Sequence, residues 1–294
     1  MNIGLLSVSM NVYSTQRIAN EAKKLGHDIG WIDHTQCSIK IGTNQPEVIF
    51  KQENILDVFD AIIPRIGTKV TRHGASVVKQ FEMNQVFSTA KSGSISKARN
   101  KAKTLQLMSN WGIPIPETLF SIDPDDIEQQ IDLLGGAPLI IKIQVGTHGL
   151  GVILAETKKS AKSIIETFYK MDTNILMQEF IEESNGEDIR VFVIGDKVVA
   201  SMKRTSGNDE FRSNVHRGGR TEAVKLTTKE EFMAINAAKH IGLGVAGVDL
   251  IRSKKGPLLI EINASPGLQG IEAATGVNVA KKIIQFVERN CRKK

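Results

Sequence analysis

The chain has 294 residues, of which 41% are hydrophobic and 24% charged, and its formal net charge is +6 at pH 7. This length and composition are typical of a globular enzyme with two or three packed domains, and they exclude a fibrous or low-complexity chain. No apolar run is long enough to cross a membrane, and the N-terminal sequence lacks the basic leader of a signal peptide. We therefore expect a cytoplasmic protein that does not enter the membrane.

The excess of lysine and arginine favours an acidic partner, which leaves nucleotide phosphates, an acidic substrate or RNA as alternatives. Aromatic residues make up 5% of the chain and do not alternate with the basic ones. That pattern disfavours a platform for single-stranded nucleic acid. The two cysteines, Cys37 and Cys291, lack the spacing of a metal or redox motif, so we expect two incidental free thiols.

The predicted elements begin with a small α/β unit. Its strands are expected at Ile3–Leu6, Asp28–Ile32 and Ala61–Ile63. Its helix is expected at Ser14–Leu25, capped by Ser14 and ended at Gly26. A single basic helix is then expected from Ser96 to about Asn110. It ends before the glycine- and proline-rich stretch 112–116, which we interpret as the approach to a second domain.

The remaining sequence predicts two further α+β units. The second unit has expected strands at Leu139–Ile143, Val152–Ala155 and Ile175–Gln178, and an expected helix at about Lys159–Met171. The third unit follows without a linker. Its expected parts are the hairpin Asp188–Lys203, a helix opened by the capping box Thr228-x-x-Glu231 and ended at Gly242, a second hairpin, and a helix at about Val279–Cys291.

The second hairpin of this unit carries three oxygen-bearing side chains. Two apolar runs, 245–251 and 257–262, flank a polar turn, and a turn centred near Lys255 places Asp249 opposite Glu261, with Asn263 on the same face. Two carboxylates and an amide oxygen suit Mg²⁺. The alternative, that both carboxylates are ordinary strand residues, is disfavoured because an unpaired carboxylate within an apolar strand is costly.

Two glycine patterns lead to opposite interpretations. The segment Gly242–Gly247 has the spelling G-x-G-x-x-G, but it follows a helix and precedes a strand, which is the reverse of the dinucleotide-binding order. The segment Gly146–Gly151 joins two strands just after Lys142, so its backbone N–H groups can cover phosphates beside a cation. A plain hairpin tip remains the alternative there, and His148 is expected to be an exposed loop residue.

Basic residues gather in a further strand and loop. Asp188 and Arg190 share one strand face, and the loop 211–219 contains two arginines, a histidine and an amide; an intrastrand ion pair beside an exposed basic loop is one alternative. Anion binding and an exposed basic loop are both compatible with this spacing. Together with the metal hairpin and the glycine-rich segment, the loop supplies the parts needed to hold a nucleoside triphosphate during phosphoryl transfer.

Over almost its whole length the chain resembles the ATP-grasp enzymes, and closely the RimK-type ribosomal-protein glutamate ligases. The motifs that carry the resemblance are Pro64-Arg-Ile-Gly67, 135–142, 146–151, Gln178-Glu-Phe180, Asp188-Ile-Arg190, 211–219 and 246–270. The resemblance implies an α/β and α+β architecture. An N-terminal pre-ATP-grasp α/β domain (1–95) precedes two ATP-grasp subdomains, a central one with the glycine-rich lid (96–178) and a C-terminal one with the metal site (179–294).

The resemblance also implies roles for individual residues. Lys101 and Lys142 contact the ATP phosphates, the backbone around Glu179 and Phe180 recognises adenine, and Asp188 recognises ribose, with Glu187 as an alternative. The remaining implied site residues are Arg212, Ser213 and Asn214 at the nucleotide, Asp249, Glu261 and Asn263 at the metal, and Arg212 with Arg190 or Arg204 at an acyl phosphate.

The implied reaction is the ATP-dependent joining of L-glutamate to the C-terminal carboxylate of a small-subunit ribosomal protein or to a growing polyglutamate chain. ATP and two Mg²⁺ ions, replaceable by Mn²⁺, are the implied cofactors, and neither nucleic acid nor a membrane is required. A homo-oligomer is also expected. The alternatives are a different acceptor, a small-molecule kinase, and a catalytically silent ATP-binding regulator or RNA-associated protein. Two departures from the family pattern are His148, which is expected only to tune the lid, and the loop 7–11, which leaves the acceptor open.

Overall fold

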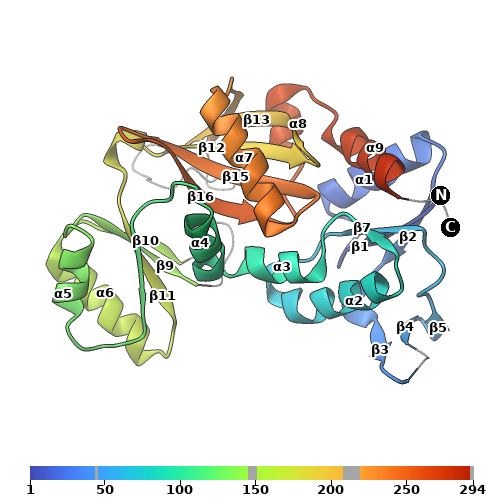
Figure 1. Cartoon of the computed structure of the whole chain (residues 1–294), viewed down its shortest axis with the longest axis horizontal. Helices are drawn as coiled ribbons and strands as arrows, with labels where there is room; N and C mark the ends of the chain where they lie inside the picture. The colour runs from blue at the N-terminus through green and yellow to red at the C-terminus, as the bar shows by residue number, and fades with distance from the viewer. Residues whose placement is uncertain (44–45, 145–150, 208–218, 292–294) are drawn as a thin grey trace.

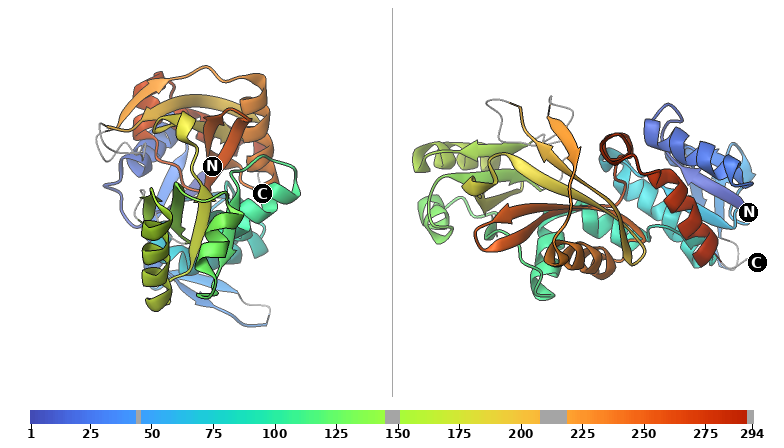
Figure 2. Two further views of the ribbon diagram at one scale, coloured as in Figure 1. Left: turned by 90° about the vertical axis from the view of Figure 1, so that its left-hand side faces the viewer. Right: turned by 90° about the horizontal axis from the view of Figure 1, so that it is seen from above.

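The computed structural model of the chain describes residues 1–43, 46–144, 151–207 and 219–291. They form three parts along the longest axis of the molecule, with the N-terminal domain and the central subdomain at opposite ends and the C-terminal subdomain between them (Figures 1 and 2). Within these ranges, no helix combines the length and the apolar character that a membrane crossing requires.

The N-terminal domain is built on a parallel sheet of strand order β2-β1-β6-β7, with α1 and α2 beside it. Its elements are β1 (Asn2–Leu6), α1 (Tyr13–Lys24), β2 (Asp28–Ile32), η1 (His34–Gln36), β3 (Ser38–Lys40), β4 (Glu47–Phe50), β5 (Glu53–Asn54), β6 (Ala61–Pro64), η2 (Thr68–Val70), α2 (Thr71–Met83) and β7 (Phe87–Ser88). Ile3, Leu5 and Leu6 of β1 are fully buried. A parallel sheet of this kind requires such continuous apolar strands, because helices cover its faces.

The predicted cap of the first helix is wrong. Helix α1 begins at Tyr13, after Val12, so Ser14 lies inside its first turn. The Ser14 hydroxyl instead accepts a hydrogen bond from the backbone N of Leu268 at 2.9 Å. A side chain that resembles a local helix cap is therefore used to fix a segment 254 residues further along the chain.

The central subdomain is an antiparallel sheet of order β10-β9-β11-β8 covered by two helices. Its elements are β8 (Thr118–Ser121), α5 (Ile127–Leu133), β9 (Leu139–Ile143), β10 (Val152–Ala155), α6 (Lys158–Lys170) and β11 (Ile175–Glu179). The apolar sides of these elements enclose a core of their own around Ile141, Ile165 and Met177. This part confirms the α+β pattern predicted from the strand and helix periods.

The C-terminal subdomain is an antiparallel sheet of order β14-β13-β12-β15-β16. Its elements are η3 (Glu182–Ser184), β12 (Glu187–Ile194), β13 (Lys197–Thr205), β14 (Arg220–Ala223), α7 (Thr228–Ile241), β15 (Val245–Ser253), β16 (Gly256–Asn263), α8 (Gln269–Thr275) and α9 (Val279–Asn290). The capping box at the start of α7 lies one residue earlier than predicted. Thr227, not Thr228, is the N-cap, and it exchanges hydrogen bonds with Glu230.

The predicted single basic helix is two helices. Helix α3 (Ser92–Arg99) and helix α4 (Lys101–Asn110) are separated at Asn100, whose side chain accepts a hydrogen bond from the Lys103 backbone and caps α4. Both contact α7 and β16 and contribute Ile95 and Met108 to a core shared with the C-terminal subdomain. The stretch 96–110, expected to belong to the central subdomain, therefore packs against the C-terminal one.

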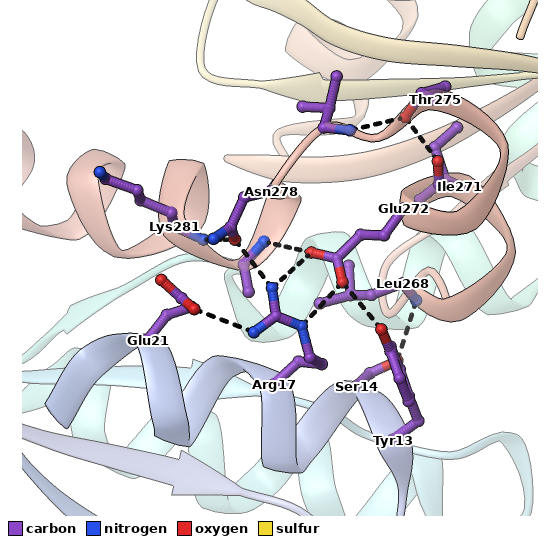
Figure 3. Close-up of polar contacts among 12 residues, drawn as sticks. Tyr13, Ser14, Arg17, Glu21, Leu268, Ile271, Glu272, Thr275, Asn278 and Lys281 are labelled. Atoms are coloured by element: carbon purple, nitrogen blue, oxygen red, sulfur yellow. Dashed lines mark hydrogen bonds and ion pairs between the residues drawn. The ribbon is translucent and has the colours of Figure 1, made fainter. Parts of the chain in front are cut away.

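A polar network joins the N-terminal domain to the C-terminal subdomain (Figure 3). Arg17 of α1 donates from Nε to Glu272 Oε2 of α8 at 2.9 Å and from Nη2 to Asn278 Oδ1 at 3.1 Å. Its Nη1 also binds Glu21 at 3.0 Å. Beneath the network, α1 and α9 pack side by side and share an apolar core that includes Ile18 and Ile283. The two parts are therefore joined by both polar and apolar contacts.

Candidate active site

The register of the β15–β16 hairpin confirms the predicted opposition of Asp249 and Glu261, with Asn263 opposite Gly247. The turn differs from the prediction. Ser253 pairs with Gly256, so the loop has two residues, and an irregularity between Asp249 and Leu250 then shifts the register by one residue. This β-bulge is the reason that Asp249 faces Glu261, because the two-residue turn alone would place it out of register.

Asp249 lies at the centre of a chain of ion pairs across three adjacent strands. Arg190 of β12 donates to its two oxygens at 2.7 and 2.5 Å, and Arg204 of β13 reaches Oδ2 at 3.1 Å. Arg204 also binds Asp188 at 2.5 and 2.6 Å. Burial opposes ionisation of Asp249, but the charges of Arg190 and Arg204 outweigh burial and hold the pKa of this carboxyl below its usual value.

The intrastrand pair between Asp188 and Arg190, one of the two alternatives left open by the spacing, does not form. Each residue pairs with the residue opposite it on a neighbouring strand, Asp188 with Arg204 and Arg190 with Asp249. Directly opposed residues in an antiparallel sheet have Cβ atoms about 5 Å apart, whereas residues two positions apart on one strand are separated by about 7 Å. The cross-strand partners are therefore the nearer ones.

The donor chemistry of the hairpin fits a hard cation. Asn263 Nδ2 lies 3.4 Å from Asp249 Oδ2, so the amide and both opposed carboxylates share one face of the sheet. In the described ranges, no group of three or more His, Cys, Asp and Glu side chains is arranged to hold a metal. Mg²⁺ commonly takes only one or two carboxylates and completes its shell with water and phosphate. A cation here would share Asp249 with the two arginines.

Two lysines and Glu261 converge from three separate elements. Lys142 of β9 donates to Gln178 Oε1 of β11 at 2.5 Å, Lys101 is the first residue of α4, and Glu261 lies on β16. Burial lowers the pKa of the Lys142 ammonium to about 8, the charge of Glu261 opposes this shift, and the charge of Lys101 adds to it. A desolvated ammonium beside a second cation marks a site where a bound anion is favourable.

The implied adenine and ribose positions have partners within the protein. Glu179 ends β11, and its backbone N and side chain are bonded to the backbone of Glu117 at 2.9 and 3.0 Å, with Phe180 directly after it. Both oxygens of Asp188 accept from Arg204. Glu187 binds Lys203 Nζ at 2.9 Å. The nucleotide roles of these residues stay predictions.

Several predicted residues lie outside the described ranges. They are Arg212, Ser213 and Asn214 of the basic loop, and the glycine-rich segment 146–150 with His148. Gly151, at the end of that segment, is described and has a φ of +74°, and a Cβ there would lie 2.3 Å from Ile143 Cγ1. Both the backbone conformation and the close approach to β9 therefore require glycine.

Sequence reasoning assigned no role to Arg65, Arg99 or Gln178. Gln178 links Lys142 to Thr118, to which its Nε2 donates at 2.7 Å. Arg65 and Arg99 lie where the N-terminal domain meets β16. The available signal for Arg65 was its position directly after a buried parallel strand, since ligands bind at the carboxyl ends of such strands.

The ATP-grasp class is defined by two α+β subdomains preceded by an α/β domain. The two lysines and the carboxylate-bearing hairpin described above complete this pattern. The RimK pre-ATP-grasp domain matches residues 1–95, and the RimK-like ATP-grasp domain matches residues 98–287. The chain belongs to the RimK-like ATP-grasp family. It is an ATP-dependent carboxylate–amine ligase, which forms carbon–nitrogen bonds, and ATP binds to its ATP-grasp fold.

Curated relatives match the whole chain. A probable alpha-L-glutamate ligase of Vibrio cholerae is 49% identical over 294 residues, covering 100% of this chain and 97% of the relative. Another from Vibrio atlanticus is 50% identical over 292 residues, covering 99% and 97%.

Solved structures share the fold at lower identity. The ATP-grasp ligase PsnB, complexed with a minimal precursor, Mg and ADP, has a TM-score of 0.76 at 18% identity, covering 99% of this chain and 97% of that one. A RimK domain ATP-grasp protein of Sphaerobacter thermophilus has a TM-score of 0.74 at 19% identity, covering 97% and 99%.

Proposed function

We propose that this protein is a Mg²⁺-dependent glutamate ligase that joins the amine of L-glutamate to a carboxylate of a peptide or protein acceptor. The observation that carries the proposal is the convergence of Lys101, Lys142 and Glu261 beside the ion-pair chain of Asp249. The names of the curated relatives support glutamate as a substrate, and the PsnB complex with its precursor supports a peptide acceptor.

The lysines act on the nucleotide. Lys101 and Lys142 bind the ATP phosphates, and phosphate binding restores to the Lys142 ammonium the electrostatic stabilisation that it loses by burial. Asp249, Glu261 and Asn263 would hold Mg²⁺, for which Mn²⁺ can substitute. When bound, the metal neutralises charge that develops on the transferred phosphoryl group.

The arginines of the ion-pair chain act on the acyl group. Arg190 and Arg204 are already oriented by Asp249 and Asp188, so they need little rearrangement to oppose negative charge in the site. With Arg212, they stabilise the acyl phosphate that forms when the acceptor carboxylate attacks the γ-phosphate and ADP leaves. Adenine contacts Glu179 and Phe180, and ribose contacts Asp188. The last two nucleotide contacts come from Ser213 and Asn214.

The second half of the reaction forms the amide. The amine of glutamate attacks the acyl carbon, phosphate leaves, and the amine loses a proton. The acceptor is the C-terminus of a protein, with a small-subunit ribosomal protein and a growing polyglutamate chain as the two candidates. The net charge of +6 favours such acidic substrates and products.

The test measures ADP release with ATP, Mg²⁺ and an acceptor peptide, with and without glutamate, and traps the activated carboxylate with hydroxylamine. We expect a hydroxamate on the acceptor, and amide formation only when glutamate is present. Formation of a stable phosphoester without an amine would instead identify a small-molecule kinase and refute the ligase. Lys142→Met should abolish product, whereas Lys159→Met, at an exposed position on α6, should leave it unchanged.

A further inference from the structure

Arg65 and Arg99 form a pair of cationic side chains at the junction of the N-terminal domain and the metal hairpin. Arg65 directly follows β6, at the carboxyl end of the parallel sheet, where its backbone N donates to Leu6 O at 2.8 Å. Its Nη2 leaves the domain and donates to the carbonyl oxygen of Pro266, in the loop after β16, at 2.7 Å. The side chain thus bridges the two parts of the molecule.

Arg99 is the last residue of α3 and lies beside Arg65. Its Nη1 donates to Thr68 Oγ1 at 3.1 Å, and its Nη2 donates to the carbonyl oxygen of Ile66. Its Nε is buried and has no hydrogen-bond partner in the described part of the chain. The hydroxyl of Ser265, the residue before Pro266, is also buried without a partner there. Such groups are costly unless a ligand or an ordered water satisfies them.

Among the described residues, no carboxylate forms a direct ion pair with either arginine of this pair. Arg17, Arg190 and Arg204 each bind a carboxylate, but no described carboxylate lies within ion-pair distance of Arg65 or Arg99. Burial and, to a smaller extent, the neighbouring charge of Arg99 together lower the pKa of Arg65 to about 10. The two adjacent, half-buried guanidinium groups therefore repel each other, and a bound anion would remove that repulsion.

The location of the pair selects the kind of anion. The charge of Glu261 acts on Arg99 as well as on Lys142, so one arginine of the pair and one of the two lysines adjoin the same carboxylate. The phosphates of ATP are assigned to the lysines. The planar, bidentate geometry of guanidinium suits a carboxylate, which every substrate of the proposed reaction other than ATP carries.

We propose that Arg65 and Arg99 bind a carboxylate of the acidic substrate beside the phosphate site and so determine the preference for that substrate. This assignment rests on the proposed function. The carboxylate belongs either to free glutamate or to the acceptor chain, and kinetics with the two substrates varied separately distinguishes these sources.

The test compares Arg65→Gln, Arg99→Gln and Arg99→Lys with Lys69→Gln, a neighbouring exposed cation outside the site. Loss of a charge-assisted hydrogen bond should raise the KM of one carboxylate substrate about 10- to 100-fold, with the KM for ATP nearly unchanged. A raised KM for glutamate assigns the site to the amino acid, and a raised KM for the acceptor assigns it to the acceptor. Unchanged KM values for both, or an equal effect of Lys69→Gln, would overturn the proposal.

A binding measurement separates this site from the proposed function. Glutarate, a dicarboxylate without an amine, should raise the melting temperature of the wild type and of Lys69→Gln, but not of Arg99→Gln or Arg99→Lys. If the wild type shows no glutamate-dependent turnover but retains this arginine-dependent stabilisation, the function is refuted and the site stands. If turnover is normal and glutarate stabilises the arginine variants equally, the site is refuted and the function stands. Arg99→Lys keeps the charge, so it tests the site even if Arg65→Gln does not fold.

Discussion

Replacing Lys142 by methionine is expected to stabilise the ligand-free protein at pH 7 while it removes ATP binding. Burial lowers the pKa of this ammonium from 10.5 to about 8. At about 1.4 kcal/mol per tenfold change in the protonation equilibrium, the charged side chain costs up to about 3 kcal/mol. Loss of its hydrogen bond to Gln178 costs about 1–2 kcal/mol. The net gain in the free energy of unfolding is therefore about 1–2 kcal/mol.

The gain in the free energy of unfolding caused by Lys142→Met depends on pH. Because the folded-state pKa is the lower one, the unfolded chain binds more protons than the folded chain between about pH 8 and 10.5. The stability of the wild type relative to Lys142→Met thus rises with pH in that window, and the gain from the substitution is largest below pH 8. Urea unfolding followed by circular dichroism at pH 7 and pH 10, with Lys159→Met as the matched control, measures both values. A destabilised variant at pH 7, or an equal gain at both pH values, would show that burial does not destabilise the charged form of Lys142.

Three further substitutions test the architecture around the site. Asp249→Asn should lower the free energy of unfolding by about 3–5 kcal/mol in urea, because it removes the buried carboxylate that Arg190 binds. Gly247→Ala should cost about 1–3 kcal/mol and weaken binding of a fluorescent ATP analogue, because its Cβ would lie 2.8 Å from the ring of a proline. Glu272→Gln should cost about 1 kcal/mol at low salt and less at about 1 M salt, measured by thermal unfolding.

Each of these predictions has a contradicting result. An Asp249→Asn protein that unfolds at the wild-type urea concentration would show that the ion-pair chain is not coupled to folding. The control for Gly247→Ala is Gly93→Ala in α3, where an added Cβ meets nothing within 4 Å. Equal losses in the two glycine variants would exclude the steric explanation. A cost for Glu272→Gln that does not fall with salt would argue against an ion pair at the domain interface.

Local patterns predicted the elements of the fold better than their ends. The strand runs at Leu139–Ile143 and Val245–Ile251 were found because buried apolar residues make a strong signal. The break at Asn100 was missed, since Asn is compatible with a helix interior as well as with a cap. The role of Ser14 depends on Leu268, and no local pattern contains that distant partner.

The site was predictable only where its geometry is local. Asp249 and Glu261 belong to one hairpin, so counting from the turn was sufficient, although a bulge compensated for the shorter loop. The ion pair of Asp249 with Arg190 depends on the register of two strands whose paired residues are 59 positions apart. Lys101 was singled out by family resemblance alone, because spacing could not separate it from the other cations of its helix.

Glutamate ligase activity is tested most directly by measuring the mass of the acceptor. The protein is incubated with ATP, Mg²⁺, L-glutamate and candidate acceptor peptides that end in a free carboxylate, and the products are measured by intact mass spectrometry. A glutamate ligase should produce mass increases of whole glutamyl residues at the acceptor carboxylate, absent without ATP and absent in Lys142→Met. An acceptor that gains the mass of a phosphate, or that gains no mass while ATP is consumed, would contradict this expectation.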